Sequence, residues 1–191
     1  GECDYCRRGL YSVCERSNPN GAEQAKMLGY PTAGLFGYSH LTGGYPGGQA
    51  EYLRVPFAAT THVKVPDGID DEKLLFLSDI FPTGYFGAEM AEVGSGDTVA
   101  VFGCGPVGQF AIASAKLLGA GRVFAIDRHD DRLRMAQRQG AEAINFDRED
   151  PVETLKRLTG GIGVDRVIDA VGVDAQCPAH GHAAHQIGRA H

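Results

Sequence analysis

Short apolar runs and helix-spaced apolar positions alternate through the second half of the chain. Residues 99–102 form a run with the length and β-rich composition of a buried parallel strand. Apolar residues then recur at helical spacing from position 106 to 118, where Gly119 is a natural stop. A second apolar run covers residues 123–126 and ends at Asp127. The pattern predicts a strand, a helix and a second strand, which is the repeating unit of a parallel α/β sheet.

The same alternation continues to about residue 171, which predicts a larger parallel sheet. The further predicted elements are a helix over 130–139, a strand over 143–146, a helix capped by Asp150 and begun by Pro151, and a strand over 164–171. Ahead of the sheet, residues 70–77 predict a short helix, and an amphipathic helix follows that ends near Gly94.

The first part of the chain follows a different pattern. Residues 50–56 and 61–66 alternate between apolar and polar positions and predict two strands, whereas residues 22–46 lack periodicity and predict an irregular loop. Turn residues at 66–68 predict a domain boundary. The predicted division is a domain over 1–65, a domain over 66–175 and an end over 176–191. That histidine-rich end predicts disorder, although its His-x-His spacing also suits a transition metal.

Three glycines follow the first predicted strand in the spacing G-x-G-x-x-G. Gly103 permits a tight turn, Gly105 lets the backbone approach a pyrophosphate, and Gly108 lets the helix lie close to the strand. Pro106 suits the first turn of the helix, whose N-terminus presents N–H groups and a positive dipole end to phosphates. Asp127 follows Gly108 by roughly 20 residues, the spacing at which an acid binds the adenosine ribose.

This order of strand, glycine turn, helix, strand and acid is the dinucleotide-binding fingerprint of the Rossmann fold. The predicted fold class is therefore α/β, with a partial, doubly wound parallel sheet. We predict NAD as the cofactor, because Asp127 would repel the 2′-phosphate of NADP, although Arg128 could pair with that phosphate or stack on adenine. Two alternatives stay open: a doubly wound domain without a ligand, and a site for S-adenosylmethionine, which uses a similar loop and acid.

Composition and charge argue against several classes of partner. The chain is 43% hydrophobic and 22% charged, and its formal net charge is −6 without a basic run, so we expect no nucleic-acid partner. No apolar run approaches the ~20 residues of a membrane span, and nothing resembles a signal peptide, so we expect no membrane partner. The first residue is Gly1 rather than Met, which hints at a processed or truncated chain.

Three of the five cysteines crowd into the N-terminal segment as Cys3, Cys6 and Cys14. Beside a nucleotide-binding pattern, an odd cysteine count favours metal thiolates in a reducing compartment, such as the cytoplasm, over disulfides. A polar loop of this kind has little apolar core, so a bound metal would hold its fold. Structural zinc takes four ligands and this loop offers three cysteines, so a thiol-rich loop without a metal stays an alternative.

The Cys-x2-Cys-x7-Cys spacing resembles the structural-zinc loop of zinc-containing medium-chain alcohol dehydrogenases, which reads Cys-x2-Cys-x2-Cys-x7-Cys. Cys3, Cys6 and Cys14 match the last three ligands, and the first would fall one residue before Gly1. The phrase GGQAEYLRVP resembles the strand that leads out of the GroES-like catalytic domain of that family. The resemblance implies that residues 1–65 are the C-terminal part of this domain and that the chain is the middle of a longer enzyme.

The run LSDIFPTGY, residues 77–85, resembles the branch of that family that contains glutathione-independent formaldehyde dehydrogenase and formaldehyde dismutase. From the residues alone, Asp79 is most simply the cap of the helix that follows. The resemblance implies instead that Asp79 is the third protein ligand of a catalytic zinc ion, at a position that is often Cys in alcohol dehydrogenases, and that Thr83 borders the nicotinamide. It also implies that Arg132 reaches the adenosine phosphate side, against the alternative of a surface ion pair.

The expected activity is zinc-dependent transfer of a hydride from an alcohol, or from a hydrated aldehyde such as formaldehyde, to NAD. The resemblance implies one catalytic and one structural zinc ion, a small alcohol or aldehyde substrate, and a homo-oligomer. A non-catalytic nucleotide-binding or redox-sensing domain is the alternative, since the expected catalytic zinc site needs ligands upstream of this sequence. The residues predicted to bind the cofactor are Gly103, Gly105, Pro106, Val107, Gly108, Asp127, Arg128, Arg132 and Val171.

Overall fold

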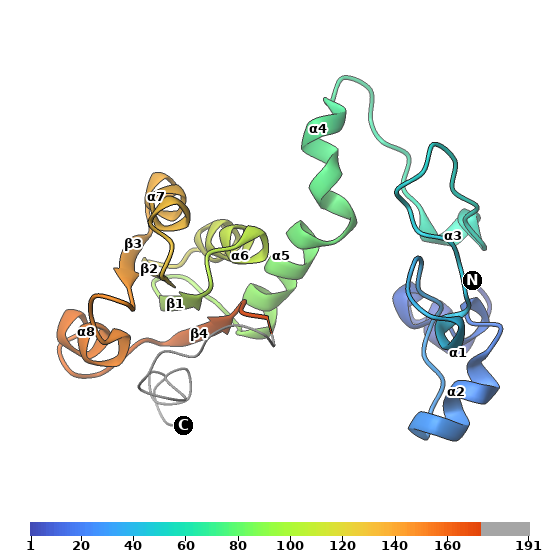
Figure 1. The fold of residues 1–191 in the computed structure, drawn as a ribbon, viewed down its shortest axis with the longest axis horizontal. Helices are drawn as coiled ribbons and strands as arrows, with labels where there is room; N and C mark the ends of the chain where they lie inside the picture. The colour runs from blue at the N-terminus through green and yellow to red at the C-terminus, as the bar shows by residue number, and fades with distance from the viewer. Residues whose placement is uncertain (173–191) are drawn as a thin grey trace. The chain divides into compact units, whose positions relative to one another are not determined.

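The chain divides into two compact units in this computed structural model, which describes residues 1–172 (Figure 1). The first unit is Gly1–Asp67, and the second begins at Gly68. Within the described residues, no helix has the length and apolar character needed to cross a membrane. The predictions made for residues 173–175 and for the histidine-rich end lie outside the described residues.

The second unit is built on a parallel sheet of four strands in the order β3-β2-β1-β4 (Figure 1). Its strands are β1 (Thr98–Phe102), β2 (Arg122–Asp127), β3 (Glu142–Asn145) and β4 (Arg166–Asp169). The strand order reverses between β1 and β4, which are neighbours in the sheet but not consecutive along the chain. In such sheets a ligand binds beyond the carboxyl ends of the strands at this switch point.

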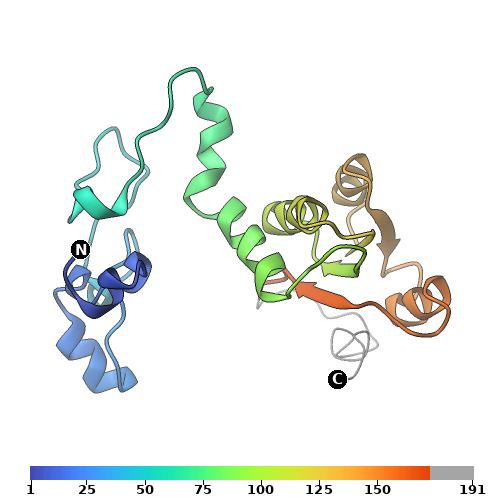
Figure 2. The same cartoon turned by 180° about the vertical axis from the view of Figure 1, so that it is seen from behind.

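Helices cover both faces of this sheet (Figure 2). These helices are α5 (Ile80–Met90), α6 (Pro106–Leu117), α7 (Asp130–Arg138) and α8 (Pro151–Leu158). The short α4 (Asp71–Leu74) and the 3-10 turn η4 (Leu75–Ser78) precede α5 and extend away from the sheet. On one face, Val99 and Val101 of β1 belong to the same buried cluster as Ala111 of α6. On the other face, Phe124 of β2 belongs to a cluster with Leu155 of α8. The doubly wound arrangement confirms the predicted α/β fold of Rossmann type.

The helix ends follow the local signals in the sequence. Pro106 and Pro151 begin α6 and α8, where a missing backbone N–H costs nothing. The carboxylate of Asp150 accepts the backbone N–H of Val152 at 2.8 Å, which confirms it as the N-cap of α8. Gly140 follows α7 with a φ of +81°, a left-handed conformation that terminates the helix and favours glycine.

The first unit consists of short helices and loops. Its elements are α1 (Asp4–Arg7), η1 (Tyr11–Val13), η2 (Glu15–Ser17), α2 (Gly21–Leu28), η3 (His40–Thr42) and α3 (Ala58–Thr61). Gln24 of α2 is only 2% exposed, and its Nε2 donates to the hydroxyl of Thr32 at 2.7 Å. Its Oε1 accepts from the amide of Asn18 at 3.1 Å, and that amide also donates to the C=O of Leu41 at 3.0 Å. Buried amides thus link segments that share little apolar core.

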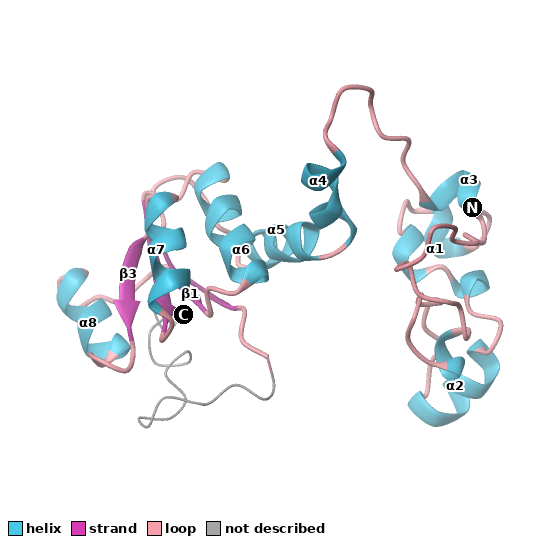
Figure 3. Ribbon diagram, turned by 45° about the horizontal axis from the view of Figure 1, so that its top comes forward, coloured by secondary structure: helices cyan, strands magenta, loops and turns pink. Residues whose placement is uncertain are grey.

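Two predictions for this unit are wrong. Residues 50–56 and 61–66 form no strand, as Figure 3 shows, and α3 lies between them. Alternation produces a strand only where one face is buried and a neighbouring strand accepts its hydrogen bonds. Here Tyr52 is 91% exposed and Val63 is 89% exposed. Part of the predicted loop over 22–46 is also helical, because α2 is composed largely of strong helix formers whose signal is propensity rather than apolar periodicity.

A partly exposed arginine at the amino end of β2 contacts a neighbouring strand and a helix. The guanidinium of Arg122 donates to both carboxylate oxygens of Glu142, at 2.8 and 2.9 Å. It also donates to the C=O of Leu158 at 2.8 Å, one of the carbonyls that α8 leaves without a helical partner. Its central carbon lies 4.7 Å from the ring centroid of Phe124. The hydrogen bond from Arg122 holds the pKa of Glu142 below its usual range, although partial burial opposes this shift.

Glu142→Gln should therefore lower the free energy of unfolding by about 0.5 kcal/mol at neutral pH, a small value because water screens both partly exposed side chains. The pKa of Glu142 is lower in the folded state, so its contribution is present above the unfolded-state pKa and is lost as pH falls through the folded-state pKa. Urea unfolding at neutral pH and at about pH 2, where the loss of stability should be smaller, measures this contribution. Glu153→Gln, in a more exposed pair with Lys156, is the matched control. A loss of equal size at both pH values would contradict the account.

Candidate functional site

The loop after β1 has the geometry that the glycine spacing predicts. Gly103 has a φ of +82°, and a Cβ there would lie 2.9 Å from a methyl carbon of Val171. A Cβ at Gly108 would lie 1.8 Å from the C=O oxygen of Gly103, so only glycine fits where α6 approaches β1. A Cβ at Gly105, in contrast, would meet no atom within 4 Å. The backbone at Gly105 therefore borders open space beside the first turn of α6, which is the kind of cradle that accepts a pyrophosphate.

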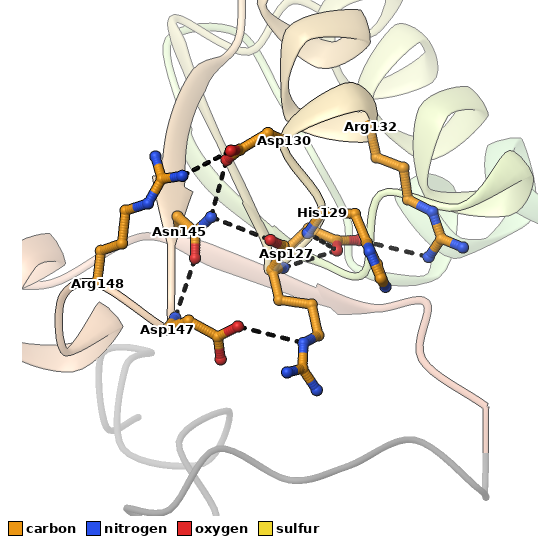
Figure 4. Close-up of polar contacts among 8 residues, drawn as sticks. Asp127, His129, Asp130, Arg132, Asn145, Asp147 and Arg148 are labelled. Atoms are coloured by element: carbon orange, nitrogen blue, oxygen red, sulfur yellow. Dashed lines mark hydrogen bonds and ion pairs between the residues drawn. The ribbon is translucent and has the colours of Figure 1, made fainter.

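The carboxylate of Asp127 is buried at the end of β2 and accepts three backbone hydrogen bonds. Its Oδ2 accepts the N–H of Cys104 at 2.7 Å. Its Oδ1 accepts the N–H groups of Arg128 and His129, at 2.7 and 2.9 Å. A guanidinium nitrogen of Arg132 lies 3.8 Å from Oδ2 (Figure 4). The side chain thus ties the glycine turn to β2 and to the start of α7, a role that the sequence analysis did not predict.

A second buried side chain, Gln109 on α6, contacts the same turn. Its Nε2 donates to the C=O of Cys104 at 2.9 Å and to the C=O of Arg132 at 3.0 Å. Its Oε1 accepts from the amide of Gln139 at 2.7 Å. Gln109 was not among the predicted site residues, because the fingerprint pattern leaves its position unspecified. The available signal was a polar residue within an otherwise apolar stretch of a helix that faces the sheet.

The other residues predicted to touch the cofactor lie around this turn. Val171 follows β4 and contacts the turn at Gly103, as the close approach of its methyl carbon shows. Arg128 places its Nε 3.2 Å from a carboxylate oxygen of Asp147, and its backbone C=O accepts from the amide of Asn145 at 3.0 Å. The structure therefore brings the predicted cofactor-binding residues together at the carboxyl ends of β1, β2 and β4.

Asn145 connects this region to the start of α7. Its amide also donates to Asp130 at 3.0 Å, and Arg148 pairs with the same carboxylate (Figure 4). The hydrogen bond from Asn145, with that from Arg148, holds the pKa of Asp130 below its usual range. Cys104 lies inside the turn, where burial and the Asp127 carboxylate raise the pKa of its thiol to about 12. The Cys104 thiol is therefore a small apolar group at neutral pH rather than a nucleophile.

Three buried cysteines converge in the first unit. The Sγ atoms of Cys3, Cys6 and Cys14 all lie within 4.8 Å of one another, and all three are free thiols. Cys3 is 3.5 Å from Cys6 and 3.9 Å from Cys14, measured between sulfur atoms. The backbone N–H of Cys6 lowers the pKa of the Cys3 thiol to about 7, whereas burial raises the pKa of Cys6. This donor set fits a tetrahedral zinc ion with one coordination position left for a fourth ligand.

Asp79 and Thr83 lie at the N-terminal end of α5, and both are exposed. Asp79 occupies the N-cap position, but its carboxylate makes no capping bond to the backbone. Its Oδ1 instead accepts from the hydroxyl of Thr83 at 2.8 Å. Apolar side chains beside it are exposed as well, with Leu75 at 70% and Leu77 at 51%. The structure therefore pairs the two predicted residues, and interpreting Asp79 as a side-chain helix cap is wrong.

Comparisons with known proteins relate most of this chain to zinc-type alcohol dehydrogenases. A family model described as zinc-binding dehydrogenase matches residues 106–190. The uncharacterized zinc-type alcohol dehydrogenase-like protein AdhB of Bacillus subtilis is 49% identical over 180 residues, which are 92% of this chain and 45% of that protein. The solved alcohol dehydrogenase TADH from Thermus sp. ATN1 is 38% identical with a TM-score of 0.80, over 99% of this chain and 49% of that one. Over most of its length the chain is therefore similar to part of a zinc-type alcohol dehydrogenase.

The similarity does not single out the formaldehyde dehydrogenase branch among the relatives. The glutathione-independent formaldehyde dehydrogenase of Pseudomonas aeruginosa is 41% identical over 193 residues, so it is one relative among several at comparable identity. The chain spans less than half the length of these relatives, with 45% of each curated relative and 49% of the solved structure covered. The cluster of Cys3, Cys6 and Cys14 could hold a metal ion, and it resembles the structural-zinc loop of zinc-dependent alcohol dehydrogenases.

The cysteine cluster should retain about one zinc ion per chain, and Cys6→Ser should abolish that retention. Zinc measured by mass spectrometry after dialysis against a chelator is the readout. Cys104→Ser is the matched control, because this thiol is buried in the other unit and should leave zinc retention unchanged. Adding a cysteine directly before Gly1 should slow zinc loss, since four thiolates close the site. Equal retention by the wild type and Cys6→Ser would contradict the assignment.

Proposed function

We propose that this chain binds NAD and a structural zinc ion as part of an oxidoreductase that transfers a hydride from an alcohol, or from a hydrated aldehyde, to NAD. The observation that carries the proposal is the contrast between the three glycines. Gly103 and Gly108 are closed in by neighbouring atoms, whereas Gly105 opens onto space at the N-terminus of α6. Such a contrast suits a pyrophosphate that approaches the backbone at one point.

NAD is preferred to NADP in this proposal because Asp127 lies beside the turn. A carboxylate at the end of β2 can bind the ribose hydroxyls and repels a 2′-phosphate. Its Oδ1 already accepts two backbone N–H bonds and its Oδ2 accepts one, so the lone pair that remains on Oδ2 would accept from a ribose hydroxyl. Arg132 stands 3.8 Å from the same carboxylate and Arg128 is paired with Asp147, so neither cation is dedicated to a phosphate.

The proposed enzyme binds two zinc ions, one structural and one catalytic. Cys3, Cys6 and Cys14 hold the structural ion, with a fourth ligand from outside the cluster. Asp79 contributes one ligand to the catalytic ion, which would polarise the substrate oxygen as a Lewis acid. The hydrogen bond from Thr83 to Asp79 orients this carboxylate and leaves its other oxygen for a metal. The exposed apolar residues beside Asp79 would then line the substrate side of the site.

The 191-residue chain should bind NAD at least about tenfold more tightly than NADP, a difference of ~1.4 kcal/mol. Gly105→Val should abolish NAD binding, because its side chain would fill the open space without displacing any atom of the fold. Gly94→Val, before the amino end of β1, is the matched control and should bind NAD like the wild type. Isothermal titration calorimetry measures the NAD affinity of the wild type and both variants, and the NADP affinity of the wild type. Equal affinities for NAD and NADP, or unchanged binding by Gly105→Val, would refute this site.

The role of Asp79 is testable in a dehydrogenase of the relatives' full length that carries this sequence. Asp79→Ala should abolish turnover and lower the zinc content by about one ion per chain, because a metal ligand is lost. NAD affinity should stay within about twofold of the wild type, since the glycine turn is untouched. Thr83→Val is the companion variant: it keeps the ligand, removes the orienting bond and should lower turnover while retaining zinc. An active Asp79→Ala enzyme with full zinc would exclude the assignment.

A further inference from the structure

We propose that Gln109 is a positioning residue for the pyrophosphate of the dinucleotide, acting through the peptide group that joins Cys104 to Gly105. The inference rests on the proposed function, because it assigns a role within the NAD site. Gln109 belongs neither to the glycine spacing nor to the acidic position of the fingerprint. Its contacts nevertheless converge on the turn that would hold the phosphates.

Two buried side chains hold the Cys104 backbone from either end. The Asp127 carboxylate accepts its N–H at 2.7 Å, and the Gln109 amide donates to its C=O at 2.9 Å. Asp127 is 4% exposed and Gln109 is 9% exposed, so water does not compete freely for either bond. The turn is therefore fixed by side chains of two different elements, one at the end of β2 and one on α6.

The orientation of the Cys104 C=O determines where the next N–H points. A trans peptide group is planar, and its C=O and N–H point in opposite directions. Because this C=O points to the buried amide of Gln109, the N–H of Gly105 points the opposite way, away from that amide. A Cβ at Gly105 would meet no atom within 4 Å, so a ligand can approach the backbone at this residue. An N–H so placed, beside the first turn of α6, can donate to a phosphate oxygen. Gln109 thereby orients the Gly105 N–H that would donate to the phosphate, without contacting the phosphate itself.

The amide of Gln109 is itself held in one orientation. Its Nε2 donates to two carbonyls, those of Cys104 and Arg132, and its Oε1 accepts from Gln139. Turning this amide by 180° would place its oxygen beside the C=O groups of Cys104 and Arg132, and its nitrogen beside the amide donor of Gln139. Methionine has a similar length but no donor, so Gln109→Met would release the peptide group while filling the same space. Gln109→Glu would keep the shape and set a carboxylate against the two carbonyls.

The test compares two ligands on the 191-residue chain, using calorimetry for NAD and NMR titration for adenosine. Gln109→Met and Gln109→Glu should each weaken NAD binding by about tenfold, the equivalent of one well-placed hydrogen bond. Adenosine binding should stay within about twofold of the wild type, because adenosine carries no phosphate. Gln139→Met is the matched control: it removes a bond to Gln109 and none to the turn, so NAD affinity should change by less than about threefold.

The outcomes separate this inference from the proposed function. If the wild type binds NAD and both Gln109 variants bind it equally well, the inference is overturned and the proposed function stands. If NAD and adenosine affinities fall together in both variants, Gln109 has a general structural role and the inference is overturned as well. If the wild type binds no NAD, the proposed function fails and the inference fails with it. A selective loss for NAD in either folded variant supports the inference.

Discussion

The buried carboxylate of Asp127 is the interaction on which the glycine turn depends. An ionised carboxylate without partners is costly to bury, so this position requires donors that converge on it. The chain supplies them from its own backbone, through Cys104 on one oxygen and through Arg128 and His129 on the other. One side chain thus fixes the end of β2, the start of α7 and the loop that leads into α6. The same carboxylate that would face a ribose is first a structural element of the turn.

Different interactions stabilise the loops of the two units. In the second unit, the turn follows a strand with a fully buried apolar centre, and the side chains of Asp127 and Gln109 fix its backbone. The first unit has a small apolar core, and its loops are joined by the amides of Gln24 and Asn18 and by three buried thiols. A zinc ion would convert those thiols from weakly interacting neighbours into ligands, which explains why a polar loop carries so many cysteines.

Secondary structure was predicted best where a local signal, such as a helix cap, coincided with a pattern of apolar residues that are buried in the fold. Runs such as 99–102 and caps such as Asp150 specify an element and its end, so the four strands and the helices between them were predicted closely. Residues 50–56 show the limit, because alternation does not reveal whether a neighbouring strand exists. Gln109 shows another limit: its partners lie on the turn, on α7 and beyond it, so its role follows from tertiary contacts rather than from spacing.

We expect a dinucleotide to bind this chain at the turn that Asp127 and Gln109 hold. The most direct measurement is an NMR titration of the backbone amides of the 191-residue chain with NAD. The account predicts the largest shifts at the amides of Cys104, Gly105, Val107 and Gly108, with smaller shifts at Arg128 and His129. Saturable NAD binding with its largest shifts elsewhere, such as in the cysteine cluster, would contradict it, as would the absence of any saturable shift.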